Sequence, residues 1–519
     1  MTETPADRPT SINIVGAGTM GSGIALAGLY AGFQVGLFDV AEAVLEQAEA
    51  YLLKHLERKD MLAARQRLRL ATDLAALPPA DLWLEAVPED LELKRRVIAE
   101  IEAHVAPETI IATNTSTLSV TALAAAADRP QRVVGLHFFN PAAVLPLVEV
   151  IRAQATSPAT IDRALAAAHA LGKTPVVVAD SPGFIVNRVA RPFYGEALRL
   201  LGEGVADVAS IDRAVESAGF KMGPFRLMDL IGIDINFTAA NSVYAQTFFE
   251  PRFRPHRIQQ QMVAQGALGR KTGSGFYDYG AGHEPEPVAW PSAGQAGRVM
   301  VAGQAWAAGL LTLLARGGGE RVEDGSQAQA AFVVAGQEED LPQLLALVDS
   351  QLPPGRPLFV QANDVSLAQA EGWLGGSDRL VGFDAWFAAD ARSMTLAAGP
   401  AVGAQVRQRA EALVGSLGRL PLWIVESPAL ILPRIVAMLV NEAAFAVGDG
   451  IAEAATIDQA MQLGANYPHG PLAWGQRLGW ERTAEVLDHL HDEYAEERYR
   501  VAPQLRRWAR RGYQLKSRS

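Results

Sequence analysis

The sequence predicts a protein of mixed α/β and all-α class, built from a doubly wound sheet domain and a helical domain that are then repeated in reduced form. Three observations lead to this prediction. A strand, a glycine turn, a helix and a second strand follow one another over residues 11–40. Long helical patterns begin near residue 188, and several segments of the first half return in the second. A chain of 519 residues has room for roughly three or four domains.

The first domain alternates strands with helices, which is typical of a parallel sheet covered on both faces. SINIV and QVGLFDV are the expected first strands, with SGIALAGLYAGF as the helix between them. The charged segment 42–74 has apolar residues at helical spacing and is expected to be helical. Further strands are expected at DLWLEAV, TIIATN, RVVGLHFF and LPLVEVI.

The internal repeat sets the expected domain order. PVVVADSPGFIVNR at 175–188 matches PLWIVESPALILPR at 421–434, and RVVGLHFF at 132–139 matches RLVGFDAW at 379–386. The Gly- and Pro-rich stretch 280–297 is the expected linker between the copies. We therefore predict a first sheet domain, a helical domain, a shorter sheet domain and a second helical domain, at residues 1–185, 186–285, 286–425 and 426–519.

Composition narrows the classes of function. The net charge of −11 disfavours a nucleic-acid partner, and the absence of cysteine excludes disulfides, thiolate metal sites and a cysteine nucleophile. The opening residues lack the features of a signal peptide, and no uninterrupted apolar run of about 18 residues occurs. The expectation is a cytoplasmic protein with no metal site, no membrane span and no nucleic-acid partner.

A glycine fingerprint marks the cofactor site. Gly16, Gly18 and Gly21 form G-x-G-x-x-G between a strand and a helix, as in a Rossmann-type dinucleotide-binding domain. Asp39 ends the next strand, where its carboxylate can bond a ribose diol and would repel a 2′-phosphate. NAD is therefore the predicted cofactor, bound by the loop residues Gly16, Gly18, Thr19, Met20 and Gly21 and by Asp39.

A candidate general base follows at the carboxyl edge of the same sheet. His137 ends the strand RVVGLHFF, and Glu149 lies in the strand-like run LPLVEVI. A histidine paired with a carboxylate is a common construction for a base that works near neutral pH. A single histidine near a strand end is more often structural, so the residues alone leave both readings open.

The sequence resembles the L-3-hydroxyacyl-CoA dehydrogenases. The resemblance rests on VGAGTMGSGIA, EAVPEDLELK, ATNTSTLS, GLHFFNPAAVLPLVEV, DSPGFIVNR, MGPFRLMDLIGID and GRKTGSGFYDY, which span residues 12–279. The layout with a reduced second sheet domain is similar to the 3-hydroxybutyryl-CoA and 3-hydroxyadipyl-CoA dehydrogenase branch. The resemblance implies that the protein oxidises an L-3-hydroxyacyl-CoA with NAD, in phenylacetate or fatty acid breakdown.

The resemblance also implies residue roles. His137 would take the proton of the 3-hydroxyl, Glu149 would orient it, and Ser116 and Asn187 would bond the substrate near the reacting carbon. The implied cofactor contacts are Glu89, Lys94, Asn114, Asn140 and Lys271. From the residues alone, Lys94 and Lys271 would instead be solvated surface charges. For the phosphates of coenzyme A the resemblance points to the region holding Lys54, Arg58 and Lys59, where a mixed run of charges is equally typical of a solvated helix face.

The second copy serves as an internal control. Aligning the halves puts Asp384 opposite His137, Thr395 opposite Glu149 and Pro433 opposite Asn187, and VMVAGQAWAAG lacks the glycine fingerprint. The second half is therefore expected to bind no dinucleotide and to catalyse nothing. We expect its helical domain to pack on the first one, as a pseudo-dimer within one chain, which leaves open a homodimer of the whole protein.

Two other functions compete with this interpretation. A sugar-acid (gulonate-type) dehydrogenase or lens-crystallin relative would share the sheet domain but not the second half. A non-catalytic NAD-binding scaffold would not need His137, Glu149, Ser116 and Asn187 together. The sequence leaves the acyl chain length open, and Arg188 and Arg191 are only candidates for binding a distal acyl carboxylate.

Overall fold

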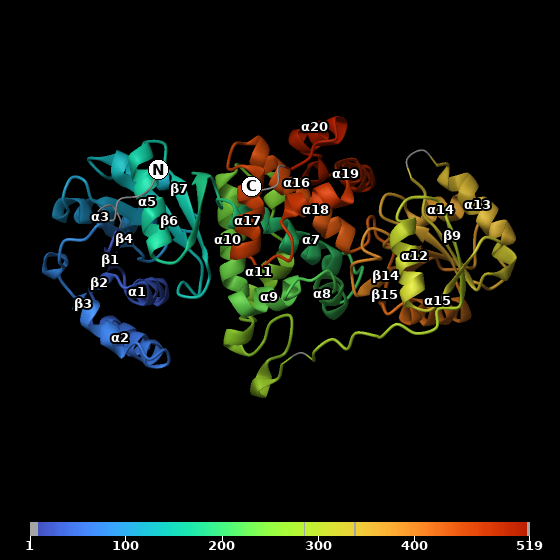
Figure 1. The fold of residues 1–519 in the computed structure, drawn as a ribbon, viewed down its shortest axis with the longest axis horizontal. Helices are drawn as coiled ribbons and strands as arrows, with labels where there is room; N and C mark the ends of the chain where they lie inside the picture. Colours follow the sequence, from blue (N-terminus) through green and yellow to red (C-terminus); the bar gives the residue numbers. More distant parts are fainter. Residues whose placement is uncertain (1–8, 285, 337–338, 516–519) are drawn as a thin grey trace. The chain divides into compact units, whose positions relative to one another are not determined.

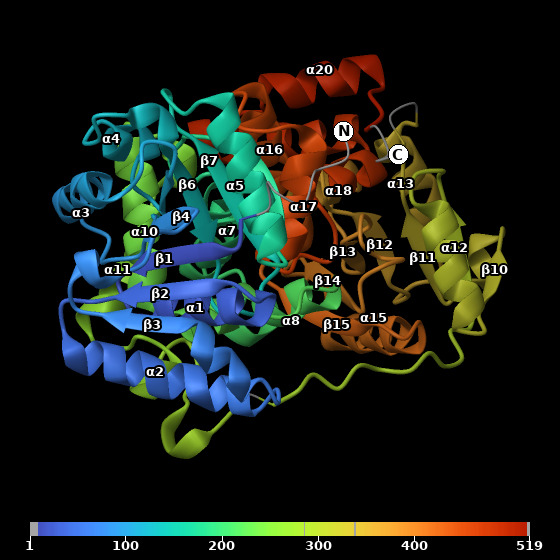
Figure 2. The same ribbon diagram turned by 60° about the vertical axis from the view of Figure 1, so that its left-hand side comes forward.

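A computed structural model describes residues 9–284, 286–336 and 339–515 of the chain. Figures 1 and 2 show the helices and strands of the described chain, which divides into two compact units. The first comprises the residues up to Val189 together with Ala446–Asn466, and the second comprises Ala190–Phe445 and Tyr467–Leu515. The four domain ranges expected from the sequence remain a prediction.

The first unit is built on an eight-stranded sheet in the order β3-β2-β1-β4-β5-β6-β7-β8. Its pairs are parallel except β6 with β7, which run antiparallel. Consecutive residues such as Ile12, Asn13 and Ile14 are buried, because helices cover both faces of the sheet. The strands are β1 (Ser11–Val15), β2 (Gln34–Phe38), β3 (Leu68–Ala71), β4 (Leu82–Glu85), β5 (Ile110–Thr113), β6 (Val133–Phe138), β7 (Leu147–Arg152) and β8 (Thr174–Ala179).

Helices follow most strands of the first unit, as the sequence predicts, but β3 and β4, and likewise β6 and β7, are joined without an α-helix. Ser157 shows how one of them begins: its side chain accepts a hydrogen bond from Thr160 N, and Pro158 occupies the first turn. The helices are α1 (Thr19–Ala31), α2 (Glu42–Glu57), α3 (Leu91–His104), α4 (Val120–Ala124), α5 (Pro158–Ala170), the short α6 (Val186–Val189) and α17 (Ala454–Gly464) from the second half.

One expectation for the first unit is wrong. The charged segment 42–74 is not helical throughout, because its later part forms β3 (Leu68–Ala71) at the edge of the sheet. Arg69 is exposed on this strand, whereas Leu68 and Ala71 are buried. The edge position tolerates the charge, so the short strand lacks the apolar pattern of its neighbours.

The second unit contains a seven-stranded sheet in the order β10-β9-β11-β12-β13-β14-β15. Within residues 286–336 and 339–515, this repeats the order of the first sheet without a counterpart of β3, which confirms the predicted reduced copy. The core includes Phe332 stacked on Phe359 with ring centroids 4.5 Å apart. The elements are β9 (Arg298–Ala302), α12 (Ala307–Arg316), β10 (Glu320–Val322), β11 (Ala330–Val333), α13 (Leu341–Gln351), β12 (Leu358–Gln361), α14 (Leu367–Trp373), β13 (Leu380–Phe383), β14 (Ser393–Ala398), α15 (Ala404–Ser416) and β15 (Leu420–Ile424).

The remainder of the second unit is helical and draws on both halves of the sequence. Figure 1 shows the green helices α7–α11 beside the red helices α16 and α18–α20. Their bounds are α7 (Arg191–Gly202), α8 (Val208–Ser217), α9 (Pro224–Ile231), α10 (Ile233–Gln246), α11 (Arg257–Ala264), α16 (Leu432–Gly448), α18 (Pro471–Leu478), α19 (Trp480–Tyr494) and α20 (Pro503–Arg511). Among the described residues, none of the helices combines the length and apolar character that a membrane crossing requires.

Contacts between the two halves are reciprocal. Arg498 of the second half pairs with Glu196 of the first at 3.3 Å. Their aligned counterparts make the reverse contact, because Arg252 of the first half pairs with Glu442 of the second at 2.8 Å. The backbone repeats the pattern: Val425 N donates to Val205 O, and Ala179 N donates to Ile451 O, both at 2.9 Å. Such exchange is the signature of a two-fold relationship between copies.

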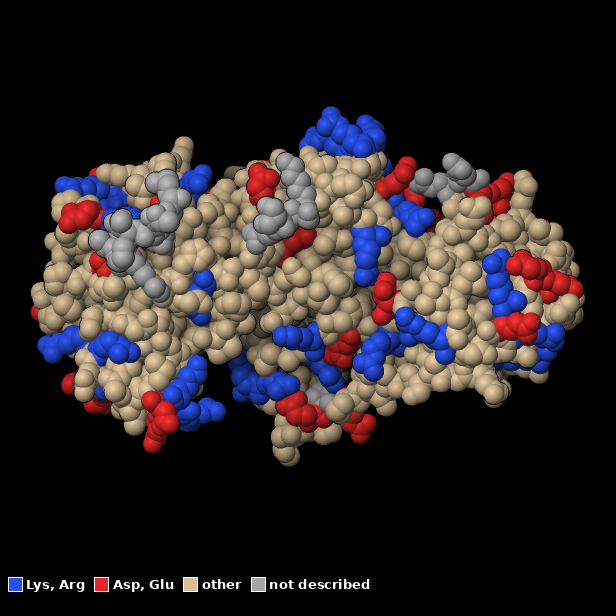
Figure 3. Space-filling view, in the orientation of Figure 1, with Lys and Arg blue, Asp and Glu red and all other residues tan. Residues whose placement is uncertain are grey.

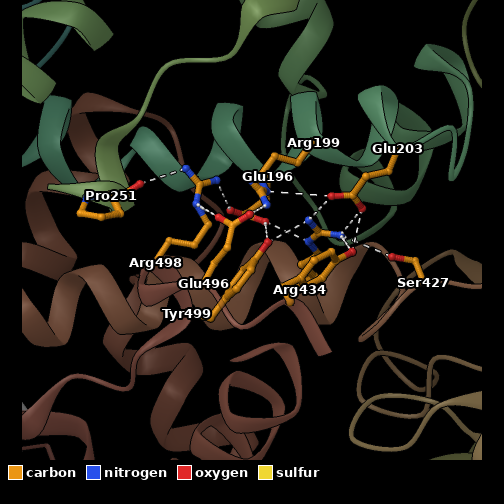
Figure 4. A network of polar contacts seen from close by, with 10 residues as sticks. Glu196, Arg199, Glu203, Pro251, Ser427, Arg434, Glu496, Arg498 and Tyr499 are labelled. Atoms are coloured by element: carbon orange, nitrogen blue, oxygen red, sulfur yellow. Dashed lines mark hydrogen bonds and ion pairs between the residues drawn. The ribbon is translucent and has the colours of Figure 1, made fainter. Parts of the chain in front are cut away.

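A buried charge network lies at the centre of these contacts (Figure 4). Arg434 is fully buried, and its guanidinium is 2.9 Å from both Glu196 Oε2 and Glu203 Oε2. The hydroxyl of Tyr499 accepts from Arg434 and donates to Glu196, both at 2.9 Å. Burial alone would raise the pKa of Glu196, but the arginines outweigh it and lower that pKa. The network therefore ties α7 of the first half to α16 of the second through fully paired charges.

Candidate active site

The antiparallel pairing of β6 with β7 sets His137 directly opposite Glu149. His137 Nδ1 lies 2.7 Å from Glu149 Oε2, and the two side chains are 5% and 0% exposed. A carboxylate only accepts hydrogen bonds, so Nδ1 carries the ring proton and Nε2 is left to accept one. The strand pairing thus fixes both the orientation and the tautomer of the imidazole.

Ser116 lies at the other nitrogen of the same ring. It follows β5, and its Oγ is 3.1 Å from His137 Nε2. Parallel strands bind ligands at their carboxyl ends, and Ser116 and His137 occupy that edge together. Nε2 and the serine hydroxyl therefore offer a reacting hydroxyl one proton acceptor and one hydrogen-bond partner.

The second carboxylate oxygen of Glu149 connects the histidine to the segment that carries Asn187. Glu149 Oε1 accepts hydrogen bonds from Ile185 N at 2.9 Å and from Val186 N at 3.1 Å. Val186 opens α6, and Asn187 is the next residue of that helix. One buried carboxylate thus holds both the imidazole and the start of α6.

The glycine loop after β1 suits the pyrophosphate of a dinucleotide. Gly16 has a φ of 105°, and a Cβ there would meet Ala86 O at 2.7 Å, so only glycine fits the turn. Gly18 faces open space, because a Cβ there would have no neighbour within 4 Å, and α1 begins at the next residue, Thr19, without a side-chain cap. Free N–H groups at a helix N-terminus favour an anion. The residues present therefore fit NAD.

Asp39 lies beside this loop and is held by it. Its Oδ2 accepts from Ala17 N at 2.9 Å, and its Oδ1 accepts from Ala41 N at 3.1 Å. Each carboxylate oxygen retains acceptor capacity for a ribose hydroxyl. The carboxylate is thus fixed where the sequence places the ribose contact.

Lys94 differs from the expectation drawn from the residues alone, since it is 1% exposed rather than a solvated charge. Its Nζ lies 2.7 Å from Glu85 Oε1 and 3.4 Å from Glu89 Oε2. Burial would raise the pKa of Glu89, but Lys94 and hydrogen bonds from the 115–117 loop outweigh it and lower that pKa. Glu89 Oε1 accepts from Ser116 N at 2.9 Å. Glu89 and Lys94 therefore support the loop that carries Ser116.

Sequence reasoning missed Glu85, which is the centre of this buried cluster. Glu85 is 0% exposed at the end of β4 and accepts from Lys94 Nζ and from Thr113 Oγ1. Its Oε1 also accepts from Val87 N at 2.7 Å. An acidic residue inside the apolar run DLWLEAV was the available signal, because a charge in a buried strand needs a partner.

Three further residues predicted to contact the cofactor, Asn114, Asn140 and Lys271, lie in different surroundings. Asn114 Oδ1 accepts from Phe138 N at 2.9 Å and joins the ends of β5 and β6. Asn140 is exposed just beyond His137. Lys271 belongs to the second unit, where its Nζ lies 2.6 Å from Asp234 Oδ1.

The residues predicted for coenzyme A lie on or after α2. Lys54 is exposed in the last turn of that helix, and the Lys59 ammonium lies 4.1 Å from the ring centroid of Tyr30. Figure 3 shows basic and acidic side chains mixed over the visible face of this region rather than a uniform basic patch. The surface is thus as compatible with a solvated helix face as with a phosphate site.

Comparison with known proteins decides the family. The profile described as 3-hydroxyacyl-CoA dehydrogenase, NAD binding domain, matches residues 11–181. The C-terminal domain profile of the same enzymes matches residues 183–279 and 430–518. The chain belongs to the 3-hydroxyacyl-CoA dehydrogenase family. It is an NAD-dependent oxidoreductase of that family, and the matches to both helical domains confirm the predicted duplication.

Individual relatives of this dehydrogenase cover either the whole chain or its first half. A 3-hydroxyadipyl-CoA dehydrogenase from Escherichia coli (strain K12) is 37% identical over 96% of this chain and 97% of the relative. A 3-hydroxybutyryl-CoA dehydrogenase from Mycobacterium tuberculosis (strain CDC 1551 / Oshkosh) is 39% identical and matches 53% of this chain with 100% of its own length. The crystal structure of 3-hydroxybutyryl-CoA dehydrogenase from Escherichia coli K12 has a TM-score of 0.80 and 35% identity, covering 98% of this chain and 100% of that one.

The second half of the dehydrogenase repeats the shape of the first site without its groups. Asp384 and Thr395 take the places of His137 and Glu149, and Asp384 N donates to Thr395 O at 3.2 Å. Gly303 keeps the tight turn after β9, with a φ of 90°. Glu339 Oε2 accepts from Gln304 N in that turn at 2.9 Å, much as Asp39 Oδ2 accepts from Ala17 N in the first copy. The copies differ instead in their glycines, because Ala305 and Ala308 stand where the first copy has Gly18 and Gly21.

Proposed function

We propose that this dehydrogenase acts on a dicarboxylic substrate, 3-hydroxyadipyl-CoA, with 3-hydroxybutyryl-CoA as the alternative. The relative that matches both halves from end to end is named 3-hydroxyadipyl-CoA dehydrogenase. The full-length crystal structure and the half-length relative are named 3-hydroxybutyryl-CoA dehydrogenases. A role in phenylacetate or fatty acid breakdown and a cytoplasmic location remain predictions from the sequence.

The His137–Glu149 pair is the observation that supports the mechanism. In the proposed reaction, His137 Nε2 removes the proton of the 3-hydroxyl as the carbonyl forms at C3. The Ser116 hydroxyl, 3.1 Å from Nε2, would orient that oxygen. Glu149 would stabilise the imidazolium that results. NAD, when bound, accepts the hydride that leaves C3.

Asn187 would bond the same oxygen as it becomes a carbonyl, because an amide can donate to a developing negative charge. Its placement on α6, which begins at an amide held by Glu149, supports this role. The cofactor roles of Glu89, Lys94, Asn114, Asn140 and Lys271 remain proposals, with Lys94 acting through Glu89 rather than from the surface.

No cation for a distal carboxylate follows directly from the site. Arg188 is 7% exposed and its Nη2 lies 2.6 Å from Asp449 Oδ2, so its charge is already engaged. Arg191 is also buried, with its guanidinium 5.2 Å from the Tyr194 ring centroid. Both arginines therefore favour a structural role over binding of the acyl end.

A substrate comparison tests the proposal. A site that binds the distal carboxylate through a cation would leave that cation unpaired when the uncharged chain is bound, which is costly. On the dicarboxylate proposal we therefore expect kcat/KM with NAD to be higher for 3-hydroxyadipyl-CoA than for 3-hydroxyhexanoyl-CoA by about tenfold or more. 3-Hydroxybutyryl-CoA serves as the short reference. Equal values for the two six-carbon chains would remove the dicarboxylate proposal and leave the dehydrogenase intact.

We also propose that the second half replaces a second subunit. The reciprocal ion pairs Arg498–Glu196 and Arg252–Glu442 support this proposal, because a symmetric dimer makes each contact twice. One chain would then hold one catalytic site. Titration of the dehydrogenase should accordingly give one NAD per chain, and a stoichiometry of two would contradict the proposal.

A further inference from the structure

A segment of the second half, residues 446–466, packs against the catalytic sheet within the first unit. It runs from the end of α16 through α17. Ile451 O accepts from Ala179 N at the end of β8, just before the turn that leads to α6. At the other end of the segment, a Cβ on Gly464 would lie 2.6 Å from Leu147 Cδ2 and 3.0 Å from Val186 Cγ2. The segment therefore touches the elements that carry Glu149 and Asn187.

An ion pair fastens the same segment to α6 itself. Arg188 Nη2 lies 2.6 Å from Asp449 Oδ2. Arg188 is the residue after Asn187, and the two partners are 261 positions apart in the chain. The second half thus supplies the carboxylate that holds the neighbour of a proposed substrate-binding residue.

The short helix α6 depends on such external contacts. It has four residues, which is too few for a stable helix without tertiary support. Glu149 Oε1 holds its beginning through Ile185 N and Val186 N. The Arg188–Asp449 pair holds the residue that follows Asn187. Between these two attachments the position of the Asn187 backbone is determined.

The duplication provides an equivalent ion pair without a catalytic neighbour. Arg434 aligns with Arg188, and Glu203 aligns with Asp449. Arg434 Nη1 lies 2.9 Å from Glu203 Oε2, so the contact is made in both directions. The residue before Arg434 is Pro433, whereas the residue before Arg188 is Asn187. Only one of the two pairs can therefore affect the reaction.

We propose that Asp449, contributed by the second half, is a positioning residue for the dehydrogenase reaction, which holds Asn187 in place through Arg188. The proposal rests on the function proposed above for Asn187. It gives the catalytically silent half a direct part in the site, and it explains why a chain with one catalytic copy would retain the second helical domain.

The expected effect is on turnover rather than on cofactor binding. Asp449 lies 51% exposed, so the pair is partly screened and its loss should leave the fold intact. A small displacement of a substrate-binding group can nevertheless slow a reaction by up to about a hundredfold. We expect kcat to fall roughly 5- to 30-fold in Asp449→Asn. The NAD loop shares no element with this pair, so NAD affinity should not change.

The experiment compares Asp449→Asn with Glu203→Gln, its aligned counterpart, in the full-length protein. Both substitutions remove one charge and keep the side-chain shape. The measurements are kcat and KM for 3-hydroxybutyryl-CoA, the Kd of NAD, the unfolding midpoint and hydrogen exchange of the amides of Ile185 and Val186. Asp449→Glu, which restores the charge, should recover most of the lost turnover.

Supporting results are a fall in kcat and faster exchange of these two amides in Asp449→Asn, with neither in Glu203→Gln. Equal kinetics in the two variants, or wild-type exchange in Asp449→Asn, would overturn the positioning role. A wild-type protein that turned over no 3-hydroxyacyl-CoA would instead overturn the proposed function. The exchange measurement needs no substrate, so the two failures remain distinguishable.

Discussion

Glu149 uses its two carboxylate oxygens for two different partners: Oε2 lies 2.7 Å from His137 Nδ1, and Oε1 accepts from two backbone amides at the start of α6. Every one of these contacts requires an acceptor. An amide at position 149 would present a donor to one of them. The carboxylate is therefore needed for the order of the site as well as for its charge.

His137→Gln should lose most turnover while the dehydrogenase still binds NAD. Removing a positioned general base typically costs about a hundred- to ten-thousand-fold in rate. The glycine loop and Asp39 are untouched by the change, so the Kd of NAD should remain near the wild-type value. Steady-state kinetics and NAD titration of the same preparation check this, and near-normal turnover in a folded variant would sink the assignment.

The choice of cofactor should depend on Asp39. The wild type should favour NADH over NADPH by about a hundredfold or more in reduction of a 3-oxoacyl-CoA, because a carboxylate near the ribose repels a 2′-phosphate. Asp39→Ser should narrow that preference. Comparing kcat/KM for the two cofactors measures it, and equal use of both by the unmodified protein would contradict the assignment.

Local sequence patterns were sufficient for the framework of the site. Glycine spacing and alternating apolar residues are properties of one segment, so the loop at Gly16 and the strands around it were predictable. The pairing of His137 with Glu149 was predicted from two neighbouring strands and a family resemblance. β3 was missed because an edge strand with Arg69 on its exposed face lacks a distinctive pattern.

Partners that are distant in sequence could not be assigned in this way. Lys94 has the composition of a surface residue, and only the packing of α3 on β4 brings its ammonium to Glu85. Asp449 is further still from Arg188, and the pair depends on how the two halves fold together. Both ion pairs form only when the sheet and the two copies have folded together.

Arg434→Met should destabilise the helical core of the second unit. Arg434 is fully buried and forms an ion pair with Glu196. Removing one partner of a buried ion pair typically costs about 3–5 kcal/mol of stability. Arg477→Met is the control, because its pair with Asp390 is 44% and 52% exposed and should contribute less than about 1 kcal/mol. Thermal unfolding midpoints compare the two, and equal shifts would contradict the importance of the buried network.

Asp384→Asn should leave the kinetics unchanged and stabilise the protein in a pH-dependent way. Asp384 stands where the first half has His137, and its burial raises its pKa from 3.8 to about 7, despite hydrogen bonds from Phe387 N, Asn363 and Trp386 N that lower it. Between about pH 4 and 7 the folded protein keeps a proton here that the unfolded chain has released. The contribution of Asp384 to the free energy of unfolding of the wild type therefore falls as the pH rises through that window.

Asparagine can accept the same hydrogen bonds and does not ionise, so the variant does not lose stability at this position as the pH rises. The variant's advantage in stability should grow from about pH 4 to about pH 7 and then level off, at no more than about 4 kcal/mol. Other buried acids such as Asp212, whose pKa burial also raises to about 7, are common to both proteins and cancel in the difference. Unfolding midpoints of both proteins at pH 5, 7 and 8.5 test this, and a difference that is constant with pH would show that Asp384 does not titrate in that window.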